Sequence, residues 1–303
     1  MPGPPLVSIG IPTFNRAEGL QRALRSALAQ DYGAVEIVVS DDASTDATES
    51  LMLPLAGQER RLRYVRQQSN LGHARNFQAL LDAARGEYFM WLSDDDWIDP
   101  TYVSACMAVL SSDPGYSLVG GLARYYTDGR HVVDERPTDL LSARPASRVL
   151  EYLARVNVNG VLFGVARRAD LRELSFREQV GGDWLLVAGL AATGRVRTLP
   201  GVHIHRSLDG LSSDRQELGE SLGMSGWRAR QHHFAVAAGF AREIATAPAY
   251  ARLGAPRRGV LALLTAALIV LRFPGGFALR RLLQALRLGR LEAAAIAWVR
   301  SRD

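Results

Sequence analysis

Short apolar runs alternate with helical stretches over the first 110 residues, and this alternation constrains the fold more than any other feature. The apolar runs have the length of buried strands and cover residues 6–11, 35–39, 62–65 and 88–92. Helical periodicity lies between and after them, at residues 17–30, 48–55, 74–84 and 100–110. Strands and helices at this spacing predict an α/β fold with a Rossmann-like, mostly parallel sheet flanked by helices.

Polar clusters directly follow three of these predicted strands. They are Pro12-Thr13-Phe14-Asn15-Arg16, Asp41-Asp42-Ala43-Ser44-Thr45-Asp46 and Ser93-Asp94-Asp95-Asp96-Trp97. In an open parallel sheet, ligands bind outside the carboxyl ends of the strands. The sequence therefore predicts a binding site where the three clusters meet.

Three adjacent carboxylates, Asp94, Asp95 and Asp96, follow the fourth predicted strand. Neighbouring acids raise one another's pKa, and a cation relieves their repulsion. Oxygen ligands of this kind favour Mg²⁺ or Mn²⁺, with substrate phosphates completing the coordination. The alternative is a solvated acidic turn or a helix N-terminus. The apolar strand before the acids, with Trp97 and Pro100 after them, favours the metal site.

Asp41 and Asp42 follow the second predicted strand. A carboxylate at this position can accept the imide N–H of uracil or the hydroxyls of ribose. Ser44, Thr45 and Asp46 are typical N-cap residues, and the start of the next helix explains them without a further role.

Several protein classes are excluded. The chain has no lysine, which rules out a Walker A loop and a Schiff-base enzyme. No G-x-G-x-x-G follows a predicted strand, so a dinucleotide fold has no support. Cys106 is the single cysteine, so no intrachain disulfide can form, and the first residues do not resemble a signal peptide. We therefore expect a cytoplasmic protein.

The second half predicts strands at residues 116–124, 130–133 and 160–166, with helices at 147–156 and 183–192. A short strand pair is expected at 196–199 and 202–205, and a helix at 216–242. From residue 251 onward, ten arginines stand against two acids. The apolar run at 260–271 is too short to span a bilayer, which takes about 20 residues.

Arginines and apolar faces in this tail predict helices that lie in a membrane interface, at the cytoplasmic face. The alternative is a helical pair that packs on the domain or on another subunit. Nucleic acid is not expected as a partner, because few aromatic residues suited to base stacking are present.

Four segments in order resemble the inverting glycosyltransferases of family 2, which have the GT-A fold. They are Val7-Ser8-Ile9-Gly10-Ile11-Pro12-Thr13-Phe14-Asn15-Arg16, Glu36-Ile37-Val38-Val39-Ser40-Asp41-Asp42, Asn70-Leu71-Gly72-His73-Ala74-Arg75-Asn76 and Gly86-Glu87-Tyr88-Phe89-Met90-Trp91-Leu92-Ser93-Asp94-Asp95-Asp96. The resemblance implies a GT-A domain over residues 1–215, with a nucleotide-binding half (about 1–112) and an acceptor half (about 113–215). A helical region follows at 216–303.

The resemblance also implies roles for particular residues. Asp42 would hold the base, with Asp41 beside it. The nucleotide-binding residues implied in this way are Pro12, Thr13, Asn15, Arg16, Asp41, Asp42, Arg75, Asp94 and Asp95. The implied metal ligands are Asp94, Asp96 and His205, for Mn²⁺ or Mg²⁺. The family often has Asp where Ser93 stands here, which leaves open which two of the three acids coordinate the metal.

Inversion at the sugar requires a carboxylate that takes the proton of the acceptor hydroxyl. Gly182-Asp183-Trp184 is similar to the family's acidic pair at the start of a helix, which makes Asp183 the expected base. The alternative for Asp183 is a helix N-cap.

The sequence as a whole thus predicts transfer of one sugar from a nucleotide-diphosphate donor, with UDP expected, to a glycan or lipid-linked acceptor. The alternatives are a nucleotidyltransferase on a similar sheet and an inactive membrane scaffold.

Overall fold

The computed structural model of the chain describes residues 3–156, 158–174, 181–208 and 232–272. Its first half contains the predicted alternation of strands and helices. The elements are β1 (Val7–Thr13), α1 (Ala17–Leu28), β2 (Val35–Asp41), α2 (Thr48–Gln58), β3 (Leu62–Arg66), α3 (His73–Ala83) and β4 (Tyr88–Trp91). β1 lies between β2 and β4, β3 lies beyond β2, and all four are parallel.

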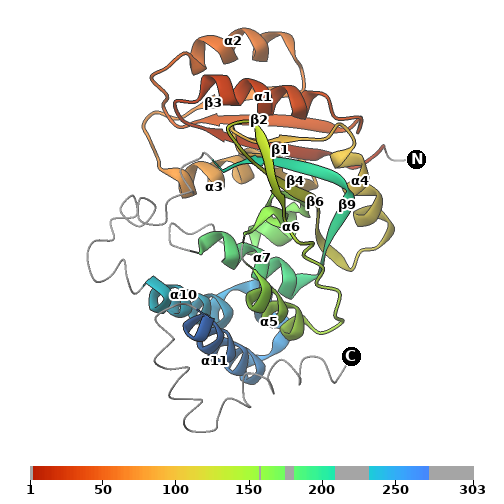
Figure 1. Cartoon of the computed structure of the whole chain (residues 1–303), viewed down its shortest axis with the longest axis vertical. Helices are drawn as coiled ribbons and strands as arrows, with labels where there is room; N and C mark the ends of the chain where they lie inside the picture. The colour runs from red at the N-terminus through yellow and green to blue at the C-terminus, as the bar shows by residue number, and fades with distance from the viewer. Residues whose placement is uncertain (1–2, 157, 175–180, 209–231, 273–303) are drawn as a thin grey trace.

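These strands are rich in apolar residues because helices cover both faces of the sheet. Every residue of β1, β2 and β4 is buried. α1 and α2 lie on one side of the parallel strands and α3 lies on the other (Figure 1). Leu20 of α1 and Leu80 of α3 are both buried against β1. The register pairs Thr13 with Asp41, so the carboxyl ends of β1 and β2 lie side by side.

The second half extends the same sheet. It contains β5 (Trp97–Ile98), α4 (Tyr102–Ser112), β6 (Tyr116–Thr127), β7 (Arg130–Asp134), α5 (Pro145–Arg155), the short 3₁₀ helix η1 (Gly160–Phe163), β8 (Val165–Arg167), α6 (Arg168–Arg172), α7 (Gly182–Thr193) and β9 (Arg195–Ser207). The strand order is β3-β2-β1-β4-β8-β6-β9-β5, with β7 beside β6. β8 is antiparallel to β4 and β6, whereas β6 and β9 are parallel. The α/β prediction is confirmed.

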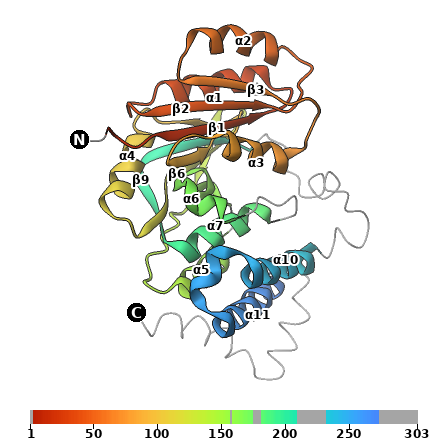
Figure 2. The same ribbon diagram turned by 180° about the vertical axis from the view of Figure 1, so that it is seen from behind.

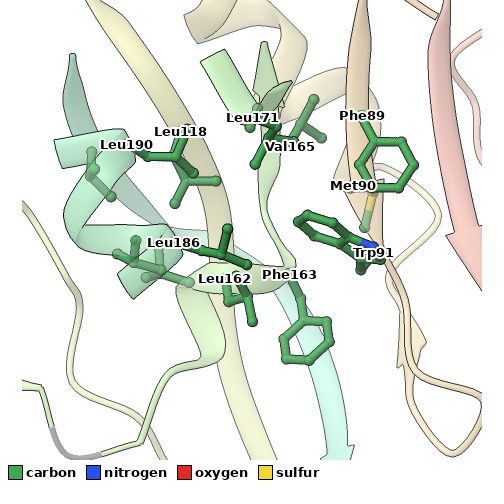
Figure 3. Close-up of a cluster of buried hydrophobic side chains, with 14 of the residues drawn as sticks. Phe89, Met90, Trp91, Leu118, Leu162, Phe163, Val165, Leu171, Leu186 and Leu190 are labelled. Carbon is green, nitrogen blue, oxygen red and sulfur yellow. The ribbon is translucent and has the colours of Figure 1, made fainter. Parts of the chain in front are cut away.

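One hydrophobic core joins the two halves. Phe89, Met90 and Trp91 of β4 belong to the same cluster of buried side chains as residues of the second half, and Trp91 points toward them (Figure 3). That cluster contains Leu118, Leu162, Phe163, Val165, Leu171, Leu186 and Leu190. The core therefore ties the acidic turn after β4 to α7, which carries Asp183.

Two predictions about the second half are wrong. Residues 160–166 form η1 followed by β8, not one strand. A continuous apolar run has no periodicity that separates these possibilities, and Gly164 lies so close to the Val119 carbonyl that a Cβ would be 2.6 Å from its oxygen. Residues 195–207 form the single strand β9, not a strand pair. Its pairing with β6 shifts register between Gly121 and Leu122.

The C-terminal part is helical where it is described. α10 (His232–Thr246), the 3₁₀ helix η2 (Pro248–Leu253) and α11 (Ala255–Arg272) lie at the end of the molecule opposite to α2 (Figure 2). α11 packs on α10 and α5, and η2 packs on α7. Of the helices in the described ranges, none combines the length and apolar character that crossing a membrane requires. The expected boundary at residue 215, the first part of the helix predicted at 216–242 and the end of the helical region predicted at 216–303 lie outside the described residues.

Candidate active site

The carboxyl end of β1 meets the acidic turn that follows β4. Thr13 Oγ1 donates a 2.8 Å hydrogen bond to Asp94 Oδ2. Arg16, just before α1, donates a 2.7 Å hydrogen bond to Asp95 Oδ2 and lies 3.7 Å from Asp94 Oδ1. The turn packs closely on α1, because a Cβ on Gly19 would lie 2.7 Å from the Asp94 carbonyl oxygen. β1, α1 and β4 thus hold these two acids in place.

An open cleft lies against this turn. Its volume is about 560 Å³, and Asn15, Arg16 and Asp95 line it together with the first turn of α1 and the Asp46–Ala47 segment. Three of the predicted nucleotide-binding residues therefore face one cleft. The partial positive charge of the helix N-terminus and the Arg16 guanidinium suit an anionic ligand, whereas the acids Glu18, Asp46 and Asp95, which also line the cleft, suit a cation.

The three acids of the turn have different surroundings. Asp94 is 8% exposed, and loss of hydration raises its pKa to about 7, against the opposing hydrogen bond from Thr13. Asp95 is partly exposed and faces the cleft. Asp96 is fully buried, and burial raises its pKa to about 6 although Arg206 favours its ionised form.

Arg206, near the end of β9, is the partner of Asp96. Its Nε donates a 2.9 Å hydrogen bond to Asp96 Oδ2, and the Ser207 N–H donates to Oδ1 at 3.3 Å. The guanidinium lies 4.1 Å from the centre of the Phe163 ring and 5.9 Å from that of Tyr125. Burial opposes the charge, but Asp96 raises the pKa of Arg206, so the side chain stays cationic.

Asp183 lies in the first turn of α7. The preceding Gly181 has φ of 76°, a left-handed conformation that glycine adopts without strain, and it turns the chain into the helix. Asn159 Nδ2 donates a 3.0 Å hydrogen bond to Asp183 Oδ2. Burial raises the pKa of Asp183, while this hydrogen bond, backbone N–H groups of the helix start and the charge of Arg206 oppose the rise.

The acids of the Asp41–Asp42 turn hold loops together. Asp41 is fully buried, and its carboxylate accepts hydrogen bonds from Ser44 N–H at 2.8 Å and Tyr64 hydroxyl at 2.5 Å. Asp42 is 3% exposed and accepts the N–H groups of Leu71 at 2.6 Å and Gly72 at 3.0 Å. The predicted contact of Asp42 with a base stays a prediction.

The remaining predicted nucleotide residues lie around these two turns. Pro12 is buried in β1, opposite Ser40. Asn15 has φ of 54° and accepts the Thr45 N–H through Oδ1 at 2.7 Å, which joins the β1 loop to the β2 turn. Arg75 is exposed on α3.

His205 belongs to a separate hydrogen-bonded group. Its Nε2 lies 2.9 Å from Asp99 Oδ1 and its Nδ1 lies 2.9 Å from the Tyr126 hydroxyl, while Trp97 stacks on the ring at 5.0 Å. Asp99 also contacts His203; burial opposes ionisation of Asp99, but the two histidines hold its pKa below the ordinary value. Both ring nitrogens of His205 are thus engaged away from Asp94, and its role as a metal ligand stays a prediction.

The donor chemistry of the acidic turn fits a divalent cation. Mg²⁺ and Mn²⁺ sites in phosphate-transferring enzymes use one or two carboxylates, water and substrate oxygens. Asp95 lines the cleft and Asp94 is its neighbour in the same turn, and a cation bound there would offset the cost of ionising buried Asp94. The described ranges contain no cluster of three or more ligating side chains that could hold a metal alone.

Sequence reasoning missed four residues of this site: Arg206, Asn159, Tyr152 and Glu135. Glu135 Oε2 accepts the Gly160 N–H at 2.9 Å, and burial raises the pKa of its carboxyl. None of the four stands in a motif with a recognisable spacing. The one available signal was the position of Arg206 directly after His205.

The sequence pattern of glycosyl transferase family 2 matches residues 8–167, which is more than half of the chain, and the chain belongs to this family. A β-1,3-glucosyltransferase of Campylobacter jejuni, which acts on GalNAc(5)-diNAcBac-PP-undecaprenol, is 30% identical over 180 residues. That match covers 59% of this chain and 57% of the relative. An uncharacterised Mycobacterium tuberculosis protein is 31% identical over 223 residues, covering 70% of this chain and 63% of that protein.

The chain spans between 22% and 63% of the length of the curated relatives it matches. Among solved structures, Staphylococcus aureus TarS 1–349 aligns with a TM-score of 0.63 and 17% identity, covering 89% of this chain and 72% of that one. The mannosyltransferase PcManGT of Pyrobaculum calidifontis, in complex with GDP-Man and Mn²⁺, aligns at 0.55 and 20%, covering 98% and 82%. These likenesses in fold confirm the GT-A prediction.

Proposed function

We propose that the chain transfers one sugar from a nucleotide-diphosphate donor to an acceptor hydroxyl, with inversion at the anomeric carbon. One observation carries the proposal: the acidic turn that follows β4 lies against an open cleft, which Asp95 lines. Arg206 is hydrogen-bonded to Asp96 of this turn. Burial raises the pKa of Asp183 at the start of α7, and the charge of Arg206 opposes that rise.

The nucleotide-binding half supplies the donor site. The cleft lined by Asn15, Arg16 and Asp95 takes the nucleoside diphosphate, with Asp42 near the base. Asp94 and Asp95 would hold Mn²⁺ or Mg²⁺, which when bound neutralises the charge that develops on the leaving diphosphate. Arg206 places a fixed positive charge on the other side of the acidic turn.

Asp183 acts as the general base. The acceptor oxygen attacks the anomeric carbon as the bond from that carbon to the diphosphate oxygen breaks, and the acceptor proton passes to an Asp183 carboxylate oxygen. The nucleoside diphosphate leaves with the bonding electron pair. A hydroxyl is a poor nucleophile at neutral pH, so a positioned carboxylate contributes about 10²- to 10⁴-fold to the rate.

The donor and acceptor follow from family membership and from one relative. We propose a UDP-sugar as donor and a lipid-linked glycan as acceptor, because the Campylobacter jejuni relative acts on an undecaprenol-linked glycan. A lipid-linked acceptor would put the proposed reaction at a membrane, and we propose its cytoplasmic face. Family membership favours sugar transfer over nucleotidyl transfer. Detection of transferase activity would exclude the alternative of an inactive scaffold.

α11 supplies the membrane contact in this proposal. Val260, Leu263 and Leu264 are 58%, 74% and 37% exposed, and Arg257 lies one turn before them. Residues 234–272 contain one acidic residue, Glu243, and it is buried. The exposed charged side chains of this range are therefore arginines. An apolar face bordered by arginines suits an anionic lipid surface.

Flotation with vesicles tests this contact. The full chain is expected to bind vesicles containing anionic lipid more than neutral ones, and Leu263→Glu should weaken binding by about tenfold or more. Leu53→Glu, at an exposed leucine on α2 at the far end of the molecule, is the matched control and should bind like wild type. Equal binding by both variants contradicts the assignment of α11.

A donor-hydrolysis screen tests the main proposal. UDP-, GDP- and dTDP-sugars are incubated with the protein, with and without Mn²⁺, and released nucleoside diphosphate is measured alongside nucleotide binding. Metal-dependent release from one donor, lost in Asp94→Asn, supports the proposal and identifies the sugar. Asp183→Asn should retain donor binding and lose transfer to the acceptor. If no nucleotide binds in any condition, the enzyme proposal is overturned and the scaffold alternative stands.

A further inference from the structure

We propose that Asn159 is a positioning residue that holds and orients the carboxyl of Asp183, with Tyr152 fixing the orientation of Asn159 from behind. The inference rests on the proposed role of Asp183 as the base. It assigns a hydrogen-bonded relay of three residues from α5, the loop before η1 and α7.

The relay is continuous in the structure. The Tyr152 hydroxyl donates a 2.8 Å hydrogen bond to Asn159 Oδ1, and Asn159 Nδ2 donates a 3.0 Å hydrogen bond to Asp183 Oδ2. Tyr152 is 1% exposed and Asn159 is 8% exposed. A buried carboxamide needs partners for both its oxygen and its nitrogen, and this arrangement supplies them.

Tyr152 decides which end of the carboxamide faces Asp183. Its hydroxyl donates to the oxygen, which leaves the N–H₂ end directed at the carboxyl. An N–H donor favours the ionised form of a carboxyl, and the ionised form is what a general base needs before it accepts a proton. The relay therefore sets both the direction and the charge of Asp183.

Other groups act on the same carboxyl. Arg206 of β9 favours its ionised form, as do backbone N–H groups at the start of α7. The charges of Glu135, after β7, and of Arg272 on α11 also act on the Tyr152 hydroxyl, at the end of the relay away from Asp183. Because Asn159 is the neutral side chain in direct contact with the base, its replacement leaves the surrounding charges in place.

The pH dependence of kcat/KM separates positioning from a purely structural role. Asn159→Ala removes the donor, so the pKa of Asp183 rises and the acid limb of the kcat/KM profile should move to higher pH by about one unit. On that limb kcat/KM falls by about tenfold. Asn159→Asp keeps the shape but faces a carboxyl with a carboxyl, so its shift should be larger and in the same direction. Tyr152→Phe should give a smaller shift, because Asn159 loses the hydrogen bond to its Oδ1 but its amide can still donate to Asp183.

Donor affinity and thermal unfolding are measured on the same proteins. Donor Kd should stay within about twofold of wild type, because the relay does not reach the cleft. The matched control is Tyr250→Phe, at a fully buried tyrosine whose hydroxyl has no hydrogen-bond partner in the described part of the chain. It should leave the pH profile unchanged.

Two results overturn the inference. If Asn159→Asp folds and lowers activity by the same factor at every pH, Asn159 supports the fold and does not act on the base. If Asn159→Ala does not fold, Asn159→Asp and Tyr152→Phe still decide the matter through their pH profiles. If Asp183→Asn retains full transfer activity, the base itself is wrongly assigned and the relay loses its function, while metal-dependent donor binding still tests the rest of the proposed site.

Discussion

The Asp41–Asp42 turn and the Asp94–Asp96 turn look alike in sequence, since each places adjacent acids after a buried strand of one parallel sheet. Their partners differ. Asp41 and Asp42 are held chiefly by backbone N–H groups and the Tyr64 hydroxyl, with the Arg66 guanidinium 3.7 Å from Asp41 Oδ2. The second turn is held chiefly by two arginines, Arg16 and Arg206.

This difference distinguishes a turn that stabilises the loops around it from a turn whose carboxylates suit a bound cation. Neutral donors satisfy carboxylates within the fold and give loops a fixed path. Asp94 and Asp96 are costly to ionise, because burial raises their pKa values and the charge of neighbouring Asp95 adds to the rise. A bound cation lowers that cost, so we expect substitutions of Asp94 and Asp95 to affect activity and those at the first turn to affect stability.

The largest effect is expected for the double variant Asp94→Asn/Asp95→Asn. Donor turnover should fall by at least about 10³-fold, because both carboxylates beside the cleft are lost. At pH 5, where Asp94 is largely protonated, the free energy of unfolding should change by less than about 1 kcal/mol, since the ion pairs with Arg16 are partly exposed. Steady-state kinetics and urea unfolding measure the two quantities. A large loss of stability with little loss of turnover contradicts the contrast between the turns.

The Asp96–Arg206 pair gives the next effect. Asp96→Asn leaves a buried arginine without its anion and should destabilise the fold by about 3 kcal/mol. Adding Arg206→Met removes the stranded charge and should recover most of that stability without recovering activity. A double-mutant cycle from urea unfolding measures the coupling. If the two losses simply add, the pair is not coupled.

Stability in the presence of a chelator should depend on pH through Asp94. Its pKa is about 7 in the folded protein, above its ordinary value of 3.8, so its contribution to stability is greatest below pH 4 and is lost as pH rises to about 7. Asp94→Asn should therefore be more stable than wild type at pH 8, by about 2 kcal/mol, and this advantage should shrink towards pH 5. Thermal melts across pH measure it, and a constant difference between the two proteins contradicts it.

The smallest effects are expected at the first turn. Asp41→Asn should cost about 1.5 kcal/mol of unfolding free energy, because an amide N–H₂ then faces one of the donors that Asp41 accepts. Tyr64→Phe, which removes one of those donors, should cost about 1 kcal/mol. Both variants should keep the kcat of wild type. A loss of turnover in Tyr64→Phe comparable to that of Asp94→Asn would mean that the first turn also takes part in the reaction.

Much of the fold was predictable from local patterns. The apolar runs of β1, β2 and β4 are buried strands because their side chains lie between two layers of helices. The acidic turn was predictable because its residues are adjacent. The run at 160–166 and the long strand β9 were not, because continuous apolar sequence fits several buried conformations.

The partners of the acids could not be predicted. Arg206 reaches Asp96 across 110 positions and Asn159 reaches Asp183 across 24, with no spacing that marks either pair. His205, for which a role as metal ligand stays a prediction, contacts Asp99 and Tyr126, and the sequence did not indicate these partners.

The amino-acid sequence alone determined the family, the parallel strands and the position of three acids at a strand end, because periodicity and adjacency are properties of neighbouring residues. The tertiary structure decided which acid contacts an arginine, which contacts neutral donors and which faces a cleft. The physical reason is that hydration and hydrogen bonding of a buried carboxyl depend on groups that the fold brings together from distant parts of the chain.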